Sequence, residues 1–147
     1  MVADRVGLQG WSNGAMTALV AMSDPAPGIR DPTPASGFRA ALVLYPGCGM
    51  ERVEGRYVPY AVVLVLLGSA DEEVSPIVCE RLATRSRAAG GPLEVVVYPG
   101  AQHDFDDPGR TRQSVEANRR ATEDAMARAE RFFGASTGQG ASKFDAD

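Results

Sequence analysis

Three short apolar runs constrain the fold of this chain more than any other feature. They cover residues 40–45, 61–67 and 93–98, and each is followed directly by Gly or by Pro-Gly. None of them shows the alternation of polar and apolar residues that a half-exposed strand would have. Such runs are typical of strands buried on both faces, so they predict a parallel sheet that is covered by helices.

A shorter strand and three helices are expected around these runs. Residues 6–10 indicate a fourth strand and residues 15–22 a short buried helix. Ser75 followed by Pro76 is typical of a helix start, and this helix is expected to end before Gly90. A long helix is expected from about residue 113 to 133. Its buried stripe is formed by Val115, Thr122, Ala125, Met126, Ala129, Phe132 and Phe133.

This order of strands and helices predicts an α/β layered fold with a mostly parallel sheet of about four strands. The length of 147 residues is sufficient for one domain and short for two. We expect a single domain over residues 1–134. Residues 135–147 are rich in Gly, Ser and Ala and are expected to form a disordered tail.

Composition excludes several classes of function. The net charge of −4 argues against a nucleic-acid or anionic-membrane surface, because both require clustered Lys and Arg. Two Cys residues are too few for a disulfide-rich scaffold or a Cys-rich zinc module, and a single His excludes a multi-His metal site. No metal or cofactor is therefore expected. The sequence shows neither a membrane-spanning run nor a signal peptide, so we expect a cytoplasmic protein without a membrane partner.

The segment Gly-Trp-Ser-Asn-Gly at residues 10–14 matches the G-x-S-x-G pattern of a nucleophile elbow. A nucleophile at the tip of a tight strand-to-helix turn needs small neighbours, and Gly10 and Gly14 provide them. The backbone amide of Asn13 would then point towards a forming oxyanion at the start of a helix. The predicted strand before this segment and the predicted helix after it are the context that the pattern requires.

The single histidine, His103, follows the strand predicted at residues 93–98, and Asp71 follows the strand predicted at residues 61–67. Both therefore lie beyond carboxyl ends of strands, where α/β folds build their sites. A serine hydroxyl needs a base, and the base needs an acid that fixes its tautomer. The order Ser12, Asp71, His103 is the order that α/β-hydrolases use.

Other residues near these positions have competing interpretations. Glu72 and Glu73 are alternatives to Asp71, although acids also serve the start of the following helix. Asp104, Asp106 and Asp107 are expected to be solvated loop charges. Trp11 and Cys48 are candidates for the pocket wall, whereas Cys79 is expected to be a packing residue.

Taken together, these segments resemble the dienelactone hydrolase family of the α/β-hydrolase fold. The resemblance rests on residues 10–14, 44–49, 67–71 and 98–105 and extends over roughly residues 4–133. It implies hydrolysis of a small-molecule ester or lactone through an acyl-enzyme. By this resemblance Ser12 is the nucleophile, Asp71 the orienting acid and His103 the base.

Two differences from the family follow from the same resemblance. The namesake enzymes carry Cys where this chain has Ser12, which points to a serine-type esterase. Family members also place several strands and two helices before the elbow strand, and a loop there normally supplies a second oxyanion amide. The expected explanations are a longer parent protein, a misassigned start or pairing with another chain.

Without neighbouring strands, the strand at residues 6–10 would have an exposed apolar edge that favours self-association. A second hypothesis is therefore a catalytically inactive α/β half-domain that acts as a binding or assembly module. Peptide-bond hydrolysis is a third, because related folds host serine peptidases.

Overall fold

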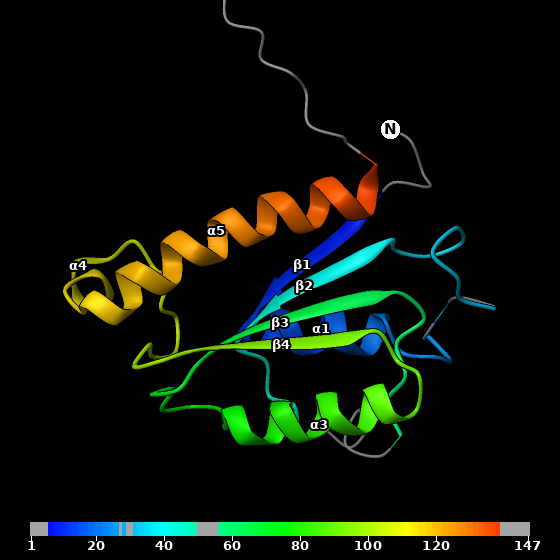
Figure 1. The fold of residues 1–147 in the computed structure, drawn as a ribbon, viewed down its shortest axis with the longest axis horizontal. Coiled ribbons are helices and arrows are strands. Elements are labelled where there is room, and N and C mark those ends of the chain that lie inside the picture. Colours follow the sequence, from blue (N-terminus) through cyan, green and yellow to red (C-terminus); the bar gives the residue numbers. More distant parts are fainter. Residues whose placement is uncertain (1–5, 27, 29–30, 50–55, 139–147) are drawn as a thin grey trace, which may run out of the picture.

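The computed structural model describes residues 6–26, 28, 31–49 and 56–138 and places a four-stranded sheet at the centre of the protein (Figure 1). The strands are β1 (Gly7–Trp11), β2 (Ala40–Leu44), β3 (Val62–Gly68) and β4 (Leu93–Tyr98). They lie in the order β1-β2-β3-β4, and every neighbouring pair is parallel. The predicted α/β class and the mostly parallel sheet are thus confirmed.

Helices cover both faces of the sheet. Helices α1 (Ser12–Ala21) and α3 (Pro76–Ala88) lie on one face, and α5 (Glu116–Thr137) lies across the other (Figure 1). A short helix, α4 (Arg110–Gln113), precedes α5. All five residues of β2 are buried, as are six of the seven in β3, which explains why the central strands are uniformly apolar.

The predicted helix at residues 113–133 differs from the structure in two ways. It is divided between α4 and α5, and α5 continues to Thr137. The break lies at Val115, whose backbone is extended (φ −86°, ψ 118°) and which precedes α5. The side chain of Gln113 donates hydrogen bonds to the carbonyl oxygens of Phe105 and Asp107, at 2.9 and 2.7 Å. The remaining residues of the predicted tail, 139–147, lie outside the described residues.

Met126 was expected in the buried stripe of this helix, but its side chain is 64% exposed. The reason is the position of α5, which contacts β1 and β2. Met126 borders a groove beside β1, and no described strand lies beyond β1 to cover it.

The cysteines also differ from the prediction. Cys48 and Cys79 form a disulfide between the loop after β2 and α3, with Cα atoms 5.1 Å apart. Both are buried, so Cys79 packs in the interior as expected, while Cys48, a candidate for the pocket wall, is only 2% exposed. The pairing was missed because 31 residues separate the two in sequence and only the fold brings them together.

Candidate active site

Ser12 lies in the tight turn where β1 passes directly into α1. Its φ of +47° is in the left-handed region, which non-glycine residues rarely adopt. The turn brings Gly10 against the first turn of α1, where a Cβ on Gly10 would lie 2.5 Å from the carbonyl oxygen of Gly14. A Cβ on Gly14 itself would meet nothing within 4 Å. Close approach therefore requires glycine at the first of the two positions and not at the second.

Asp71 and His103 lie in two loops that are hydrogen-bonded to each other beyond the ends of β3 and β4. The N–H groups of Ser69 and Ala70 donate to the carbonyl oxygens of Tyr98 and Ala101, both at 2.9 Å. The loops cross so closely that a Cβ on Gly68 would lie 2.0 Å from the Ala101 carbonyl oxygen. The glycine after the apolar run thus permits the crossing that brings the acid beside the histidine.

The structure brings Ser12, His103 and Asp71 together. Nε2 of His103 lies 3.1 Å from Oγ of Ser12, and Nδ1 lies 2.9 Å from Oδ2 of Asp71. The imidazole is almost completely buried, and the Asp71 side chain is fully so. Oδ1 of Asp71 accepts the N–H groups of Glu73 and Val74, both at 2.9 Å. These bonds hold the buried carboxylate in an orientation that faces the imidazole.

Asn13 is the second residue of α1. The amides of the first turn of a helix have no acceptor within that helix, so the Asn13 N–H is suited to bind an anion beside Ser12.

The two glutamates after Asp71 have different surroundings. Glu72 accepts the backbone N–H of His103 at 3.1 Å and forms an ion pair with Arg112 at 2.7 Å. Burial opposes ionisation of Glu72, but these two interactions outweigh it and lower its pKa below the ordinary value. Glu73 has an exposed carboxylate whose Oε2 lies 3.4 Å from Nε2 of His103. Neither glutamate contacts Nδ1 of His103, which is the nitrogen that contacts Asp71.

Helix α5 fastens the loop that carries His103. The fully buried side chain of Asn118 accepts the N–H of Gln102 at 2.9 Å and donates to the carbonyl oxygen of Arg112 at 3.0 Å. Thr122 donates to the carbonyl oxygen of Phe105 at 2.9 Å. Sequence reasoning missed Asn118, although a polar residue on the inward face of an amphipathic helix is a signal for such a bond.

Asp106 was expected to be a solvated loop charge, and the structure corrects this. Its carboxylate accepts hydrogen bonds from Nε1 of Trp11 at 2.7 Å and from the hydroxyl of Tyr45 at 2.6 Å. The ring of Tyr45 packs against that of His103, with centroids 4.6 Å apart. Trp11 and Tyr45 lie at the ends of neighbouring strands. This placement was the sequence signal that could have indicated a shared hydrogen-bond partner.

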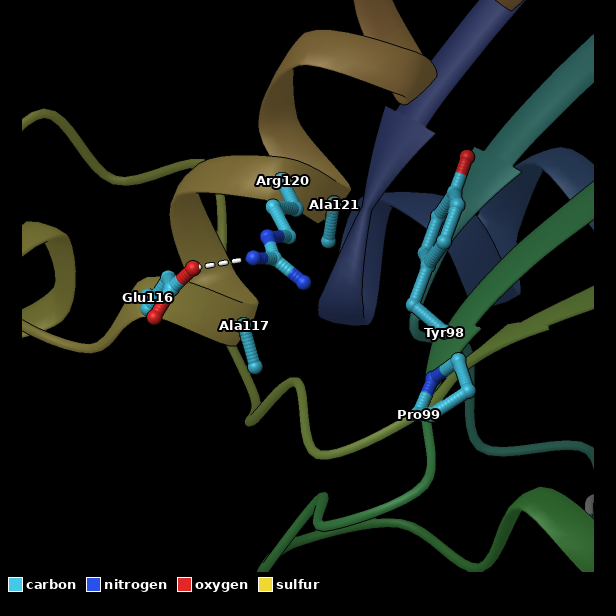
Figure 2. Close-up of a pocket in the computed structure, with 6 residues that line it drawn as sticks. All are labelled: Tyr98, Pro99, Glu116, Ala117, Arg120 and Ala121. Carbon is cyan, nitrogen blue, oxygen red and sulfur yellow. Dashed lines mark hydrogen bonds and ion pairs between the residues drawn. The ribbon is translucent and has the colours of Figure 1, made fainter.

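Two cavities lie near these elements. The first, of about 120 Å³, is the groove beside β1, and it is lined by Gln9, Trp11, Leu42, Leu44, Asp106, Thr122, Ala125, Met126 and Ala129. The second, of about 390 Å³, lies beneath the first turns of α5 (Figure 2). It is lined by Tyr98, Pro99, Glu116, Ala117, Arg120 and Ala121. Neither lining includes Ser12, Asp71 or His103.

The described residues provide neither a metal site nor a membrane-spanning helix. Among them, no group of three or more His, Cys, Asp or Glu side chains is arranged to hold a metal ion. None of the described helices combines the length and the apolar character that crossing a membrane requires.

Comparison with known proteins extends these observations. A model of the dienelactone hydrolase family matches residues 2–137. Esterase 2 of Thermogutta terrifontis phosphorylated by paraoxon has a similar structure, with a TM-score of 0.65 and 22% identity over 90% of this chain and 54% of that chain. The native form of that esterase gives a TM-score of 0.65 and 19% identity, over 98% and 58% of the two chains.

The butyrate-bound form has a TM-score of 0.63 and 19% identity, over 88% of this chain and 58% of that chain. This protein therefore spans little more than half the length of the solved structures that it resembles. At these identities the likeness establishes the α/β-hydrolase fold. Among curated protein sequences, none matches the chain.

Proposed function

Because this chain belongs to the dienelactone hydrolase family, we propose that it is a serine hydrolase that cleaves small carboxylic esters or lactones. The observation that carries the proposal is the pair of contacts made by His103, 3.1 Å to Oγ of Ser12 and 2.9 Å to Oδ2 of Asp71. A serine activated by such an oriented imidazole is suited to acyl transfer. The esterase fold of the similar solved structures supports the same reaction class.

In the proposed acylation, Nε2 of His103 takes the proton of Ser12 as Oγ attacks the ester carbonyl. The N–H of Asn13 donates to the oxyanion of the tetrahedral intermediate. Asp71 accepts Nδ1–H and stabilises the imidazolium. The intermediate then collapses, the C–O bond to the alcohol breaks, and the alcohol oxygen takes the proton from Nε2. In a lactone, this alcohol stays attached to the acyl group.

Deacylation reverses these roles with water as the nucleophile. His103 takes a proton from water, the hydroxide attacks the acyl carbonyl, and Ser12 leaves as its oxygen regains the proton from Nε2. The products are a carboxylic acid and the free serine. No cofactor is needed to balance either step.

The test is the intact mass of the protein after incubation with a fluorophosphonate probe. We expect one label on the wild type and none on Ser12→Ala or His103→Ala. A panel of short esters and lactones then defines the acyl group, and peptide amides with the same acyl groups distinguish ester from peptide-bond hydrolysis. A folded wild type that stays unlabelled contradicts the proposal.

A second candidate function is an inactive assembly module, and one observation favours it. Among the described strands, β1 pairs only with β2, so its other edge is available to a second chain. A stable oligomer whose Ser12 does not react with the probe would support this candidate.

The sequence and the disulfide support different proposals for the cellular compartment of this protein. The sequence suggests the cytoplasm, whereas a disulfide such as that between Cys48 and Cys79 is typical of an oxidising environment. The redox state of these thiols in the cell, measured by alkylation before lysis, distinguishes the two.

A further inference from the structure

Asp106 connects two strand ends to the loop that carries His103. It follows His103 by three residues, and its two carboxylate oxygens accept Nε1–H of Trp11 and the hydroxyl of Tyr45. Trp11 is the last residue of β1 and directly precedes Ser12, while Tyr45 directly follows β2. One carboxylate therefore bonds to residues that adjoin the nucleophile and the histidine ring.

Few other bonds set the distance between these parts. Within the described part of the chain, three hydrogen bonds join the loop at residues 99–109 to the ends of β1 and β2. Two of them are made by Asp106, and the third is the contact between His103 and Ser12 itself. The hydrogen bonds from β3 and α5 hold the loop from other sides, so Asp106 makes the direct side-chain hydrogen bonds to Trp11 and Tyr45 that supplement the contact of His103 with Ser12.

Tyr45 is suited to transmit this restraint to the imidazole. Its ring is 3% exposed and packs against both His103 and Phe105, with centroid distances of 4.6 and 5.5 Å. Its φ of +41° is in the left-handed region, so the side chain is directed towards the site by an uncommon backbone conformation. Burial, the hydrogen bond to Asp106 and the charges of Asp106 and Asp104 all raise the pKa of the phenol. Tyr45 therefore remains a donor to Asp106 well into alkaline conditions.

We propose that Asp106 is a positioning residue that sets the distance between Ser12 and His103 by holding Trp11 and Tyr45. This inference rests on the proposed function for its effect on rate. Asp106 bonds to neither Ser12 nor His103, so it acts through the two aromatic side chains. A displacement of about 1 Å between nucleophile and base can lower a rate on the order of 100-fold.

The kinetic test compares Asp106→Ala with the wild type and with Asp107→Ala. Asp107 is the matched control, because its carboxylate accepts the N–H of Gly109 within the same loop. For Asp106→Ala we expect a loss of about tenfold to 100-fold in kcat and in the rate of fluorophosphonate labelling, with KM changed less than about threefold. Asp107→Ala should stay within about twofold of the wild type.

Two further variants separate positioning from general stability. Asp106→Asn keeps an oxygen that can accept from Trp11 and an amide that can donate to the Tyr45 oxygen, so it should restore most of the rate. The double variant Trp11→Phe/Tyr45→Phe should reproduce the loss of Asp106→Ala. Adding Asp106→Ala to this double variant should lower the rate no further, because the effects of substitutions within one hydrogen-bonded unit are not additive. A further full loss would contradict the proposal.

NMR spectroscopy tests the role of Asp106 even if the chain proves to be catalytically inactive. The sequence contains one Trp and one His, so the indole N–H and the imidazole nitrogens give unambiguous NMR signals. In Asp106→Ala we expect an upfield shift of the Trp11 N–H and altered imidazole signals of His103, with neither change in Asp107→Ala. An unlabelled wild type would overturn the proposed hydrolase. Unchanged imidazole signals, or a wild-type labelling rate, in folded Asp106→Ala would overturn the role of Asp106.

Discussion

At the scale of single residues, Asp71 has the most demanding position in the site. Its side chain is fully buried, Oδ1 accepts two backbone N–H groups, and Oδ2 and Oδ1 lie 2.9 and 3.1 Å from Nδ1 of His103. Asp71→Asn keeps the size and can keep the backbone bonds, but it places an amide opposite Nδ1 and disfavours the tautomer that accepts the Ser12 proton. We expect ester turnover to fall by a factor on the order of 10⁴.

Stability should respond much less to the same change. The free energy of unfolding of Asp71→Asn should fall by no more than about 1–2 kcal/mol, as for the loss of one hydrogen bond. Urea unfolding and ester kinetics on one preparation make the comparison. Turnover equal to that of the wild type would exclude Asp71 from the proposed triad.

The sequence placed the three candidate catalytic residues together because a parallel sheet gathers its carboxyl ends along one edge. Ser12, Asp71 and His103 each follow a strand, so topology alone brings them close. Asp106 could not be placed this way, since its direction depends on the path of the loop, including the left-handed conformation of Asp104. The same limit applies to Tyr45, whose own φ is also positive.

At the scale of secondary-structure elements, the two glycines of the elbow make different demands on the packing of β1 and α1. Gly10→Ala would place a methyl group 2.5 Å from the backbone of α1, so the helix must shift. We expect this variant to lose about 1–3 kcal/mol, as in other overpacked sites. Gly14→Ala adds a methyl group in open space within a helix and should be neutral or more stable by about 0.5–1 kcal/mol.

Urea unfolding of the two single variants measures this difference, and each serves as the control for the other. Equal destabilisation of both would contradict the packing seen at the elbow. The motif alone treats its two glycines alike, and only the contact between β1 and α1 separates them.

The elements themselves show which features a sequence can define. Uniformly apolar composition identified β2 and β3 because the neighbours of a buried strand are all apolar. The strand β4 was expected to be equally buried, but it lies at the edge of the sheet, where Glu94 is exposed and only Leu93 and Tyr98 are buried. The break between α4 and α5 was missed because it lies in the extended backbone of Val115, whose apolar side chain fits the helical periodicity. The exposure of Met126 was missed because helical periodicity does not reveal where the sheet beneath ends.

At the scale of the whole molecule, the disulfide links the loop after β2 to α3, and its two cysteines are 31 residues apart in sequence. Removing it with Cys48→Ala/Cys79→Ala should lower the free energy of unfolding by about 2–4 kcal/mol, since the unfolded chain regains freedom. Reduction of the wild type with dithiothreitol should give a similar loss and leave the double variant unchanged. Two alkylatable thiols in protein purified under oxidising conditions would contradict the bond.

The open edge of β1 has a second consequence for the whole molecule. The carbonyl oxygen of Val6 accepts the N–H of Arg39, and this bond continues the pairing of β1 with β2 beyond the amino-terminal end of β1. Backbone groups alternate in direction along a strand, so Leu8 faces β2 as Val6 does, and Gln9 faces the open edge. That edge lies beside the groove in which Trp11 and Met126 are exposed. Unpaired backbone groups next to exposed apolar side chains favour association of two chains.

We therefore expect the wild type to form dimers or larger species by light scattering at micromolar concentration. Gln9→Pro removes the N–H that points outward and should shift the protein towards the monomer, because proline cannot donate to an added strand. Gln9→Thr is the matched control: it keeps that N–H and a strand-favouring side chain, so it should associate as the wild type does. Thermal unfolding of both variants shows whether β1 itself is intact. A wild type that stays monomeric, or a folded Gln9→Pro variant that associates unchanged, would place the contact elsewhere than at this edge.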